Sequence, residues 1–81
     1  MGEGWFARPV PISVGIAGDI RYVSSARQAV GMLSGSWRET GSAKHQAALL
    51  ACQRAMSGEM PTESARSAFV DAASEARVLF E

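Results

Sequence analysis

The chain has 81 residues, 47% of them hydrophobic and 20% charged, and its eight basic and eight acidic side chains leave no net charge. Such a composition is typical of one globular domain and excludes a disordered chain. Domains this small bury only about 60% of their unfolded surface, so we expect modest stability and a tendency to self-associate. The lack of a basic excess argues against nucleic acid as a partner.

The charged side chains are unevenly distributed along the chain. Residues 1–54 carry six basic and three acidic side chains, and residues 55–81 carry two basic and five acidic ones. The two parts therefore have net charges of +3 and −3. A generally solvated surface explains these counts, and so does a mildly dipolar molecule whose ends attract each other in an oligomer.

Cys52 is the only cysteine, so the chain cannot form an internal disulfide. Secreted domains of this size usually contain several cysteines, which makes a reducing cytoplasm the simpler expectation. No apolar run approaches the ~18 residues of a membrane span, and the first ten residues lack a signal peptide's apolar stretch. We expect a single cytoplasmic domain over residues 1–81, with a flexible segment at 1–4 and no contact with a membrane.

Two strands are predicted in the first part of the chain. Residues 10–16 alternate apolar side chains with small ones, which indicates a half-buried strand. Pro9 and Pro11 share one parity and have no N–H, so we expect that edge of the strand to stay unpaired. The side chains expected to face the core are those of Val10, Ile12, Val14 and Ile16.

A turn at residues 17–19, where Gly18 can adopt a positive φ, leads into a second strand at 20–23. Ile20 and Tyr22 should share one face of this strand, and Arg21 should point to the other. This reading places Tyr22 in the core.

Three helices follow, each with a polar residue at its start and small or apolar residues at helical spacing. The first stops at Ser34-Gly35, and Gly58 has the position of a C′ residue after the second. The predicted N-caps are Ser24 or Ser25, Ser42, and Thr62. Residues 78–80 either end the third helix or form a third strand, which the prolines would place beside residues 20–23.

These elements predict an α+β domain of order β-β-α-α-α, in which the second and third helices cover one face of an antiparallel hairpin. The first helix would lie across an end. The predicted core contains Val10, Ile12, Val14, Tyr22, Val30, Leu33, Leu49, Cys52, Phe69, Ala72 and Ala76.

His45 and Cys52 are the side chains best suited to chemistry, and they lie on one face of the second helix. They are only ~20° apart around the axis but ~10.5 Å apart along it. A nucleophile and its base need ~2.6–3.2 Å between heavy atoms, and a shared zinc needs ~2.0–2.3 Å to each ligand. We therefore expect two packed core residues, no catalytic, metal or cofactor site, and no enzymatic activity.

A second hypothesis is a small-ligand or metal-binding domain centred on His45. It requires partners from other elements, with Tyr22, Glu39 or Trp37 lining a pocket, or Asp71 or Glu75 beside the imidazole. One histidine and one cysteine supply only two intrachain ligands, which argues against a tight structural zinc site.

Large apolar side chains in polar surroundings are candidate interaction residues. Trp37 lies in a polar loop and either folds back onto the core or stays exposed as an interface anchor. Trp5 and Phe6, which precede the first strand, are likewise either packed on the core or exposed as interface anchors. Leu50 falls among polar residues of its helix. The candidate interaction residues are therefore Trp5, Phe6, Trp37 and Leu50.

The chain resembles a family of short, uncharacterised bacterial proteins, mostly alphaproteobacterial, known as domain of unknown function 982. The resemblance covers about residues 5–80 and rests on the order and spacing of single residues. These residues are Trp5, Pro9, Val10, Val23, Ser24, Ala29, Leu33, Trp37, Gly41, His45, Ala48, Cys52, Gly58, Ala65, Arg66, Phe69, Ala72, Ala73, Glu75 and Ala76. Two positions depart from the family pattern. The family often has proline at the position of Arg38 and glycine at the position of Arg77. The resemblance implies a cytoplasmic single domain but no activity, ligand or catalytic residue.

The leading functional hypothesis is a non-enzymatic protein-interaction or regulatory module that binds an unidentified protein partner or forms a weak homodimer. Small size, the lack of a catalytic pattern and the candidate interaction residues all favour it over the hypothesis centred on His45.

Overall fold

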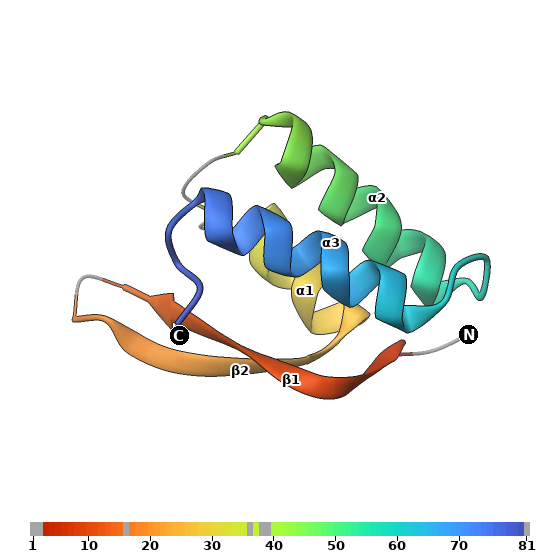
Figure 1. The fold of residues 1–81 in the computed structure, drawn as a ribbon, viewed down its shortest axis with the longest axis horizontal. Helices are drawn as coiled ribbons and strands as arrows, with labels where there is room; N and C mark the ends of the chain where they lie inside the picture. The colour runs from red at the N-terminus through yellow and green to blue at the C-terminus, as the bar shows by residue number, and fades with distance from the viewer. Residues whose placement is uncertain (1–2, 16, 36, 38–39, 81) are drawn as a thin grey trace.

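The computed structural model describes residues 3–15, 17–35, 37 and 40–80. Its elements are β1 (Trp5–Val14), β2 (Asp19–Ser25), α1 (Ala26–Ser34), α2 (Ala43–Met56) and α3 (Thr62–Glu75). The strands form an antiparallel hairpin, with the helices on one side of it (Figure 1). The predicted α+β class and the order β-β-α-α-α are thus confirmed, whereas the expected inward position of Ile16 lies outside the described residues.

The helices form two layers over the hairpin rather than one. α3 contacts β1 and α1 contacts β2, whereas α2 packs against α1 and α3 (Figure 1). The expectation that the second and third helices cover the sheet is therefore confirmed for α3 and wrong for α2, because α1 lies on the sheet in its place. α1 begins at the residue after β2 ends, so it must fold back directly over the strand that it continues. No helix of the described residues is long and apolar enough to cross a membrane.

The inward face of β2 is the opposite of the one predicted. Val23 pairs with Val10 and is buried, whereas Tyr22 pairs with Pro11 and is 61% exposed. Residues directly opposite each other in an antiparallel pair share a face, so the inward side chains of β1 determine those of β2. Because Arg21 pairs with Ile12, this charged residue lies on the helix-facing side. The polarity of the side chains alone therefore could not predict which face of this short strand points inward.

The C-terminal segment 78–80 returns to β1 and not to β2. Ile12 and Leu79 form an antiparallel bridge, in which the Phe80 N–H donates to the Pro11 carbonyl (3.0 Å) and the Ser13 N–H donates to the Val78 carbonyl (2.7 Å). The prediction that the prolines keep this edge unpaired was wrong, because proline cannot donate but its carbonyl still accepts. Donation resumes at Ser13, the next residue of the same parity.

The turn between α3 and this segment is a Schellman motif with arginine at its left-handed position. The Arg77 N–H donates to the Ser74 carbonyl (3.1 Å), and the Val78 N–H donates to the Ala73 carbonyl (3.0 Å). Arg77 has a φ of 59°, a conformation that favours glycine because a Cβ is crowded there. The helix therefore ends at Glu75, so residues 78–80 do not continue it, which was one of the two predicted alternatives.

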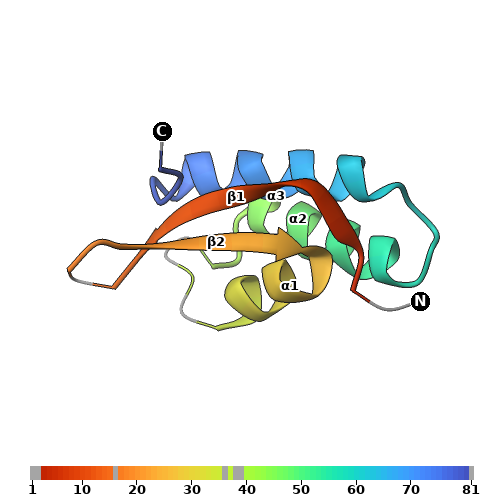
Figure 2. The ribbon, with the colours of Figure 1, turned by 90° about the horizontal axis from the view of Figure 1, so that it is seen from below.

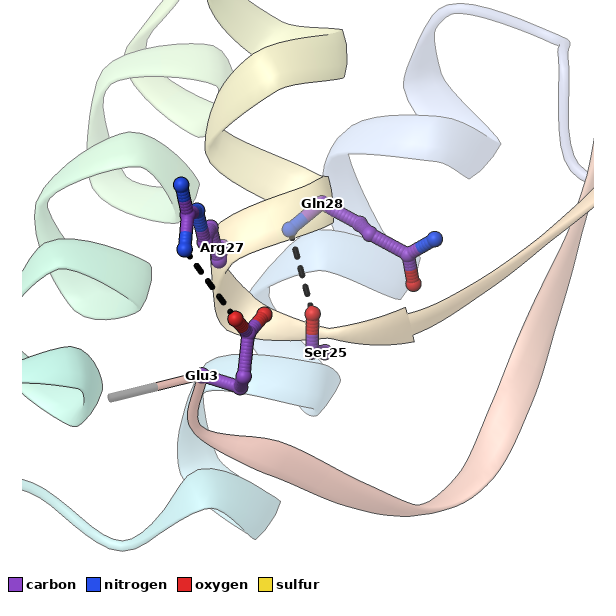
Figure 3. A network of polar contacts seen from close by, with 4 residues as sticks. All are labelled: Glu3, Ser25, Arg27 and Gln28. Atoms are coloured by element: carbon purple, nitrogen blue, oxygen red, sulfur yellow. Dashed lines mark hydrogen bonds and ion pairs between the residues drawn. The ribbon is translucent and has the colours of Figure 1, made fainter.

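The N-terminal residues Glu3 and Gly4 are bonded to the start of α1, and the first two residues of the segment expected to be flexible lie outside the described residues. The Ala26 N–H donates to the Gly4 carbonyl (2.8 Å), and the Arg27 N–H donates to the Glu3 carbonyl (3.0 Å). Glu3 also forms an ion pair with Arg27 at 3.1 Å (Figure 3). The first N–H groups of a helix have no intrahelical acceptor, so these carbonyls complete the end of α1.

The predicted helix caps are confirmed for two of the three helices. Ser25 accepts from the Gln28 N–H at 3.2 Å (Figure 3), and Ser42 accepts from the His45 N–H at 3.1 Å. Pro61 rather than Thr62 is the N-cap of α3, because Thr62 already has a helical conformation and Pro61 an extended one. Gly58 follows α2 with a φ of 82°, as its predicted role requires.

Most of the predicted core is buried in one cluster. Its fully buried members are Val10, Ile12, Leu33, Cys52, Phe69, Ala72 and Ala76. Val14, Val30 and Leu49 are partly buried against this cluster, and Tyr22 is excluded from it. Alanines line much of the contact between the helices, which lets the helices approach closely.

We predict that Arg77→Gly raises the free energy of unfolding by about 1 kcal/mol, because glycine adopts the left-handed conformation without the Cβ penalty. Urea denaturation followed by circular dichroism measures the change. Arg77→Ala is the matched control, since it removes the guanidinium but keeps the Cβ. An equal gain in both variants would assign the effect to the arginine side chain and contradict the backbone explanation.

Candidate functional site

His45 has a structural position between two helices. Its Nε2 lies 2.7 Å from the carbonyl oxygen of Leu33 in the last turn of α1, and its Nδ1 accepts from the Gly41 N–H at 3.3 Å. One imidazole tautomer, with the proton on Nε2, satisfies both contacts. Both ring nitrogens are therefore used by backbone groups, and the imidazole joins the end of α1 to the start of α2.

The partners that a ligand site at His45 would require lie elsewhere. Tyr22 is on the outer face of the sheet, Asp71 is exposed, and Glu75 accepts from the Ser42 hydroxyl at 2.6 Å. Glu39 lies outside the described residues. Among the described residues, no group of three or more His, Cys, Asp or Glu side chains could hold a metal ion.

Cys52 is fully buried, and its Sγ lies 4.0 Å from the carbonyl oxygen of Ala65 on α3. Burial raises the pKa of this thiol from 9.0 to about 11, because the thiolate would lose its hydration. The thiolate is the nucleophilic form, so the side chain is chemically inert near neutral pH. Both candidate chemical residues thus contribute to packing between helices.

The four predicted interaction residues divide into two pairs. Trp5 is 65% exposed and Leu50 is 49% exposed, whereas Phe6 and Trp37 are buried. Trp37 packs against Phe69 with 5.6 Å between ring centroids, so its indole lies against the core. Phe6 and Trp37 are therefore not exposed anchors, because the small core needs large rings to fill it.

The sequence reasoning missed a group of exposed apolar side chains whose backbones neighbour Pro11. Pro11 pairs with Tyr22 on one side and, through the bond from the Phe80 N–H, lies opposite Phe80 on the other. Tyr22 is 61% exposed and Phe80 is 52% exposed. We call Phe80, Pro11 and Tyr22 the outer row. No described helix covers this face, which is turned toward the viewer in Figure 2.

A cavity of about 440 Å³ lies on the opposite, helix-facing side of the hairpin. Arg21 and Arg77 line it together with Ile12, Met32 and Trp37. Sequence reasoning also missed this site, because its members come from four separate segments. The one available signal was Arg21, a charged residue whose inward position is visible only once the strand register is known.

The match to known proteins agrees with this architecture. The family model described as "Protein of unknown function (DUF982)" matches residues 8–80. The chain belongs to the DUF982 family. The solution structure of the Agrobacterium tumefaciens protein Atu1219, determined by NMR, is similar to this DUF982 chain with a TM-score of 0.80 and 32% sequence identity. The similarity covers 96% of this chain and 77% of Atu1219.

No curated protein matches this DUF982 chain. The Agrobacterium structure is consistent with the alphaproteobacterial character that the resemblance implied. The Agrobacterium structure therefore confirms the fold class, and the family description supplies no activity.

We predict that His45→Leu lowers the free energy of unfolding by about 1–3 kcal/mol, because the Leu33 carbonyl and the Gly41 N–H both lose their partner. Thermal and urea denaturation measure the loss. Lys44→Leu is the control, since Lys44 is exposed in the same turn of α2. A His45→Leu variant as stable as the Lys44→Leu variant would show that the two contacts contribute nothing.

We predict that Cys52 reacts slowly with iodoacetamide in the native protein and rapidly after unfolding in urea, because the buried thiol keeps its proton. The raised pKa also has a stability consequence. Between pH 9 and about 11 the unfolded thiol ionises while the folded one does not, so stability falls as pH rises.

Cys52→Ala removes this titration and is the control. It should cost about 1 kcal/mol below pH 9, and this cost should shrink toward pH 11. Cys52→Ser should cost more, since a buried hydroxyl needs a partner. Fast labelling of the folded protein would contradict the packing role.

Proposed function

We propose that this DUF982 protein is a non-enzymatic interaction module, which binds a second copy of itself through the outer face of its sheet. The observation that carries the proposal is the outer row. Tyr22 and Phe80 are both more than half exposed, and both are backbone neighbours of Pro11 in a hairpin whose outer face no described helix covers. Exposed aromatic residues that lie together are typical of protein-binding surfaces.

A non-enzymatic role is supported by the positions of His45 and Cys52. The backbone occupies both ring nitrogens of His45, and burial keeps the Cys52 thiol protonated. Neither group is free to act as a general base or a nucleophile.

A second copy is the occupant that best suits this face. A two-fold dimer needs only one self-complementary patch, and two uncovered sheets pack face to face at about 10 Å. A two-stranded hairpin is marginally stable alone, so covering its outer face would stabilise it. The net charge of zero leaves no overall repulsion between copies.

We place the module in the cytoplasm. The support is its single cysteine, which is buried as a free thiol. A small domain without a disulfide is usual in a reducing compartment.

We predict that the wild-type protein shows concentration-dependent self-association in sedimentation velocity, and that Tyr22→Ser weakens it. The substitution removes the largest side chain of the outer row while leaving the buried core intact. Leu50→Ser is the matched control, because it removes an exposed apolar side chain of α2 away from the sheet.

Both variants should melt at the wild-type monomer temperature. A wild-type protein that stays monomeric over the whole concentration series would contradict self-association. Weaker association of Leu50→Ser with an unchanged Tyr22→Ser variant would assign the interface to α2 instead. If the wild type binds a different protein and the Tyr22→Ser variant does not, the outer row is still the binding surface, but its partner is not a second copy.

A further inference from the structure

The helix-facing cavity has features that packing alone does not explain. It opens between the distal end of the hairpin, the second half of α1 and the segment after α3. Its volume of about 440 Å³ lies within the range of small-molecule sites, about 300–1,000 Å³. Ile12, Met32 and Trp37 give it an apolar side, and Arg21 and Arg77 give it a cationic one.

Gly31 lines this cavity from the middle of α1. Glycine weakens a helix interior relative to alanine, yet a Cβ added at Gly31 would meet no atom within 4 Å. Its φ is not in the positive range either. Neither backbone conformation nor close packing requires glycine at this position, so its effect is to leave the wall of the cavity open.

Two further unfavourable features border the same cavity. Arg77 occupies the left-handed position of the Schellman motif, where glycine would be more stable. The Nε1 of Trp37 is buried and has no hydrogen-bond partner among the described residues, in a side chain only 7% exposed. Destabilising backbone conformations and unsatisfied polar groups that cluster at one place are expected at functional sites.

The charge of the cavity indicates the kind of ligand. None of the described lining residues is acidic, and neither Arg21 nor Arg77 has an ion pair or side-chain hydrogen bond with a described residue. Arg21 extends from a strand position opposite the buried Ile12, and Arg77 enters from the end of α3. Guanidinium groups match the geometry of carboxylate and phosphate oxygens and bind them by paired hydrogen bonds.

We propose that this cavity binds a small organic anion. Arg21 and Arg77 would hold its carboxylate or phosphate group, and its apolar body would lie against Ile12, Met32 and Trp37. The open wall at Gly31 admits the ligand. The site is separate from the outer row, because Ile12 and Pro11 point to opposite faces of β1.

The experiment is a ¹H–¹⁵N NMR titration of the full chain in the Tyr22→Ser background, where self-association does not disturb the spectrum. The probes are 2-naphthoate, octanoate and 2-naphthyl phosphate, with 2-naphthamide and octanamide as neutral counterparts. We expect the anions to shift the signals of Gly31, Arg77 and the Trp37 indole N–H, and to bind at least about tenfold more tightly than the amides.

Three variants locate the site. Arg77→Gly should weaken naphthoate binding at least about fivefold although it stabilises the fold, and a stabilised protein that binds less cannot be explained by misfolding. Arg21→Gln should weaken binding to a similar degree. Gly31→Leu should block the cavity while strengthening the helix.

Arg27→Gln is the matched control, because Arg27 is an exposed arginine at the opposite end of α1. The proposal is overturned if none of the three anions shifts these signals. It is equally overturned if amides bind as tightly as anions, or if Arg27→Gln weakens binding as much as Arg77→Gly. Each result compares variants within the same Tyr22→Ser background, so a loss of dimerisation through Tyr22 does not enter the comparison.

Discussion

The left-handed turn at Arg77 is the constraint on which the rest of this structure depends. It ends α3 and reverses the chain, so that Leu79 bridges Ile12 on the free edge of β1. Without this reversal the helix would continue past Glu75, and the two-stranded sheet would lose its bridge to Leu79. The same turn brings the backbone of Phe80 to Pro11 and places Arg77 and Val78 at the cavity. One strained backbone position thus builds part of both candidate surfaces.

The two surfaces stay separate because a strand alternates its side chains between faces. Ile12 faces the helices and the cavity, while its neighbour Pro11 faces outward in the middle of the outer row. Binding on the outer face would contact aromatic and proline side chains, whereas binding on the inner face would contact guanidinium groups and core residues. A small domain can in this way present two chemically different sites on a single pair of strands.

Polar side chains connect the helices in the described part of the chain. His45 uses both ring nitrogens to hold the end of α1 and the turn before α2, and Ser42 joins α2 to Glu75 at the end of α3. These contacts supply partners for backbone groups that helix ends leave unsatisfied. In a core built largely from alanines, such fixed contacts determine how the helices are positioned relative to one another. The buried Nε1 of Trp37 differs from these groups, because it has no hydrogen-bond partner among the described residues.

The sequence by itself determined the elements, because periodicity and capping act over a few residues. The inward side chains of β1, the Ser42 cap, the Gly58 stop and the packing roles of His45 and Cys52 all follow from local spacing. The inward face of β2 followed only from the pairing between strands. Residues 20–23, with one arginine among them, could face the core in either register, and the pairing of Val10 with Val23 selects one. Only the tertiary structure decided which helices cover the sheet, whether Trp37 is buried, and where residues 78–80 pair. Those outcomes depend on contacts between distant segments, and both the outer row and the cavity are assembled from such segments.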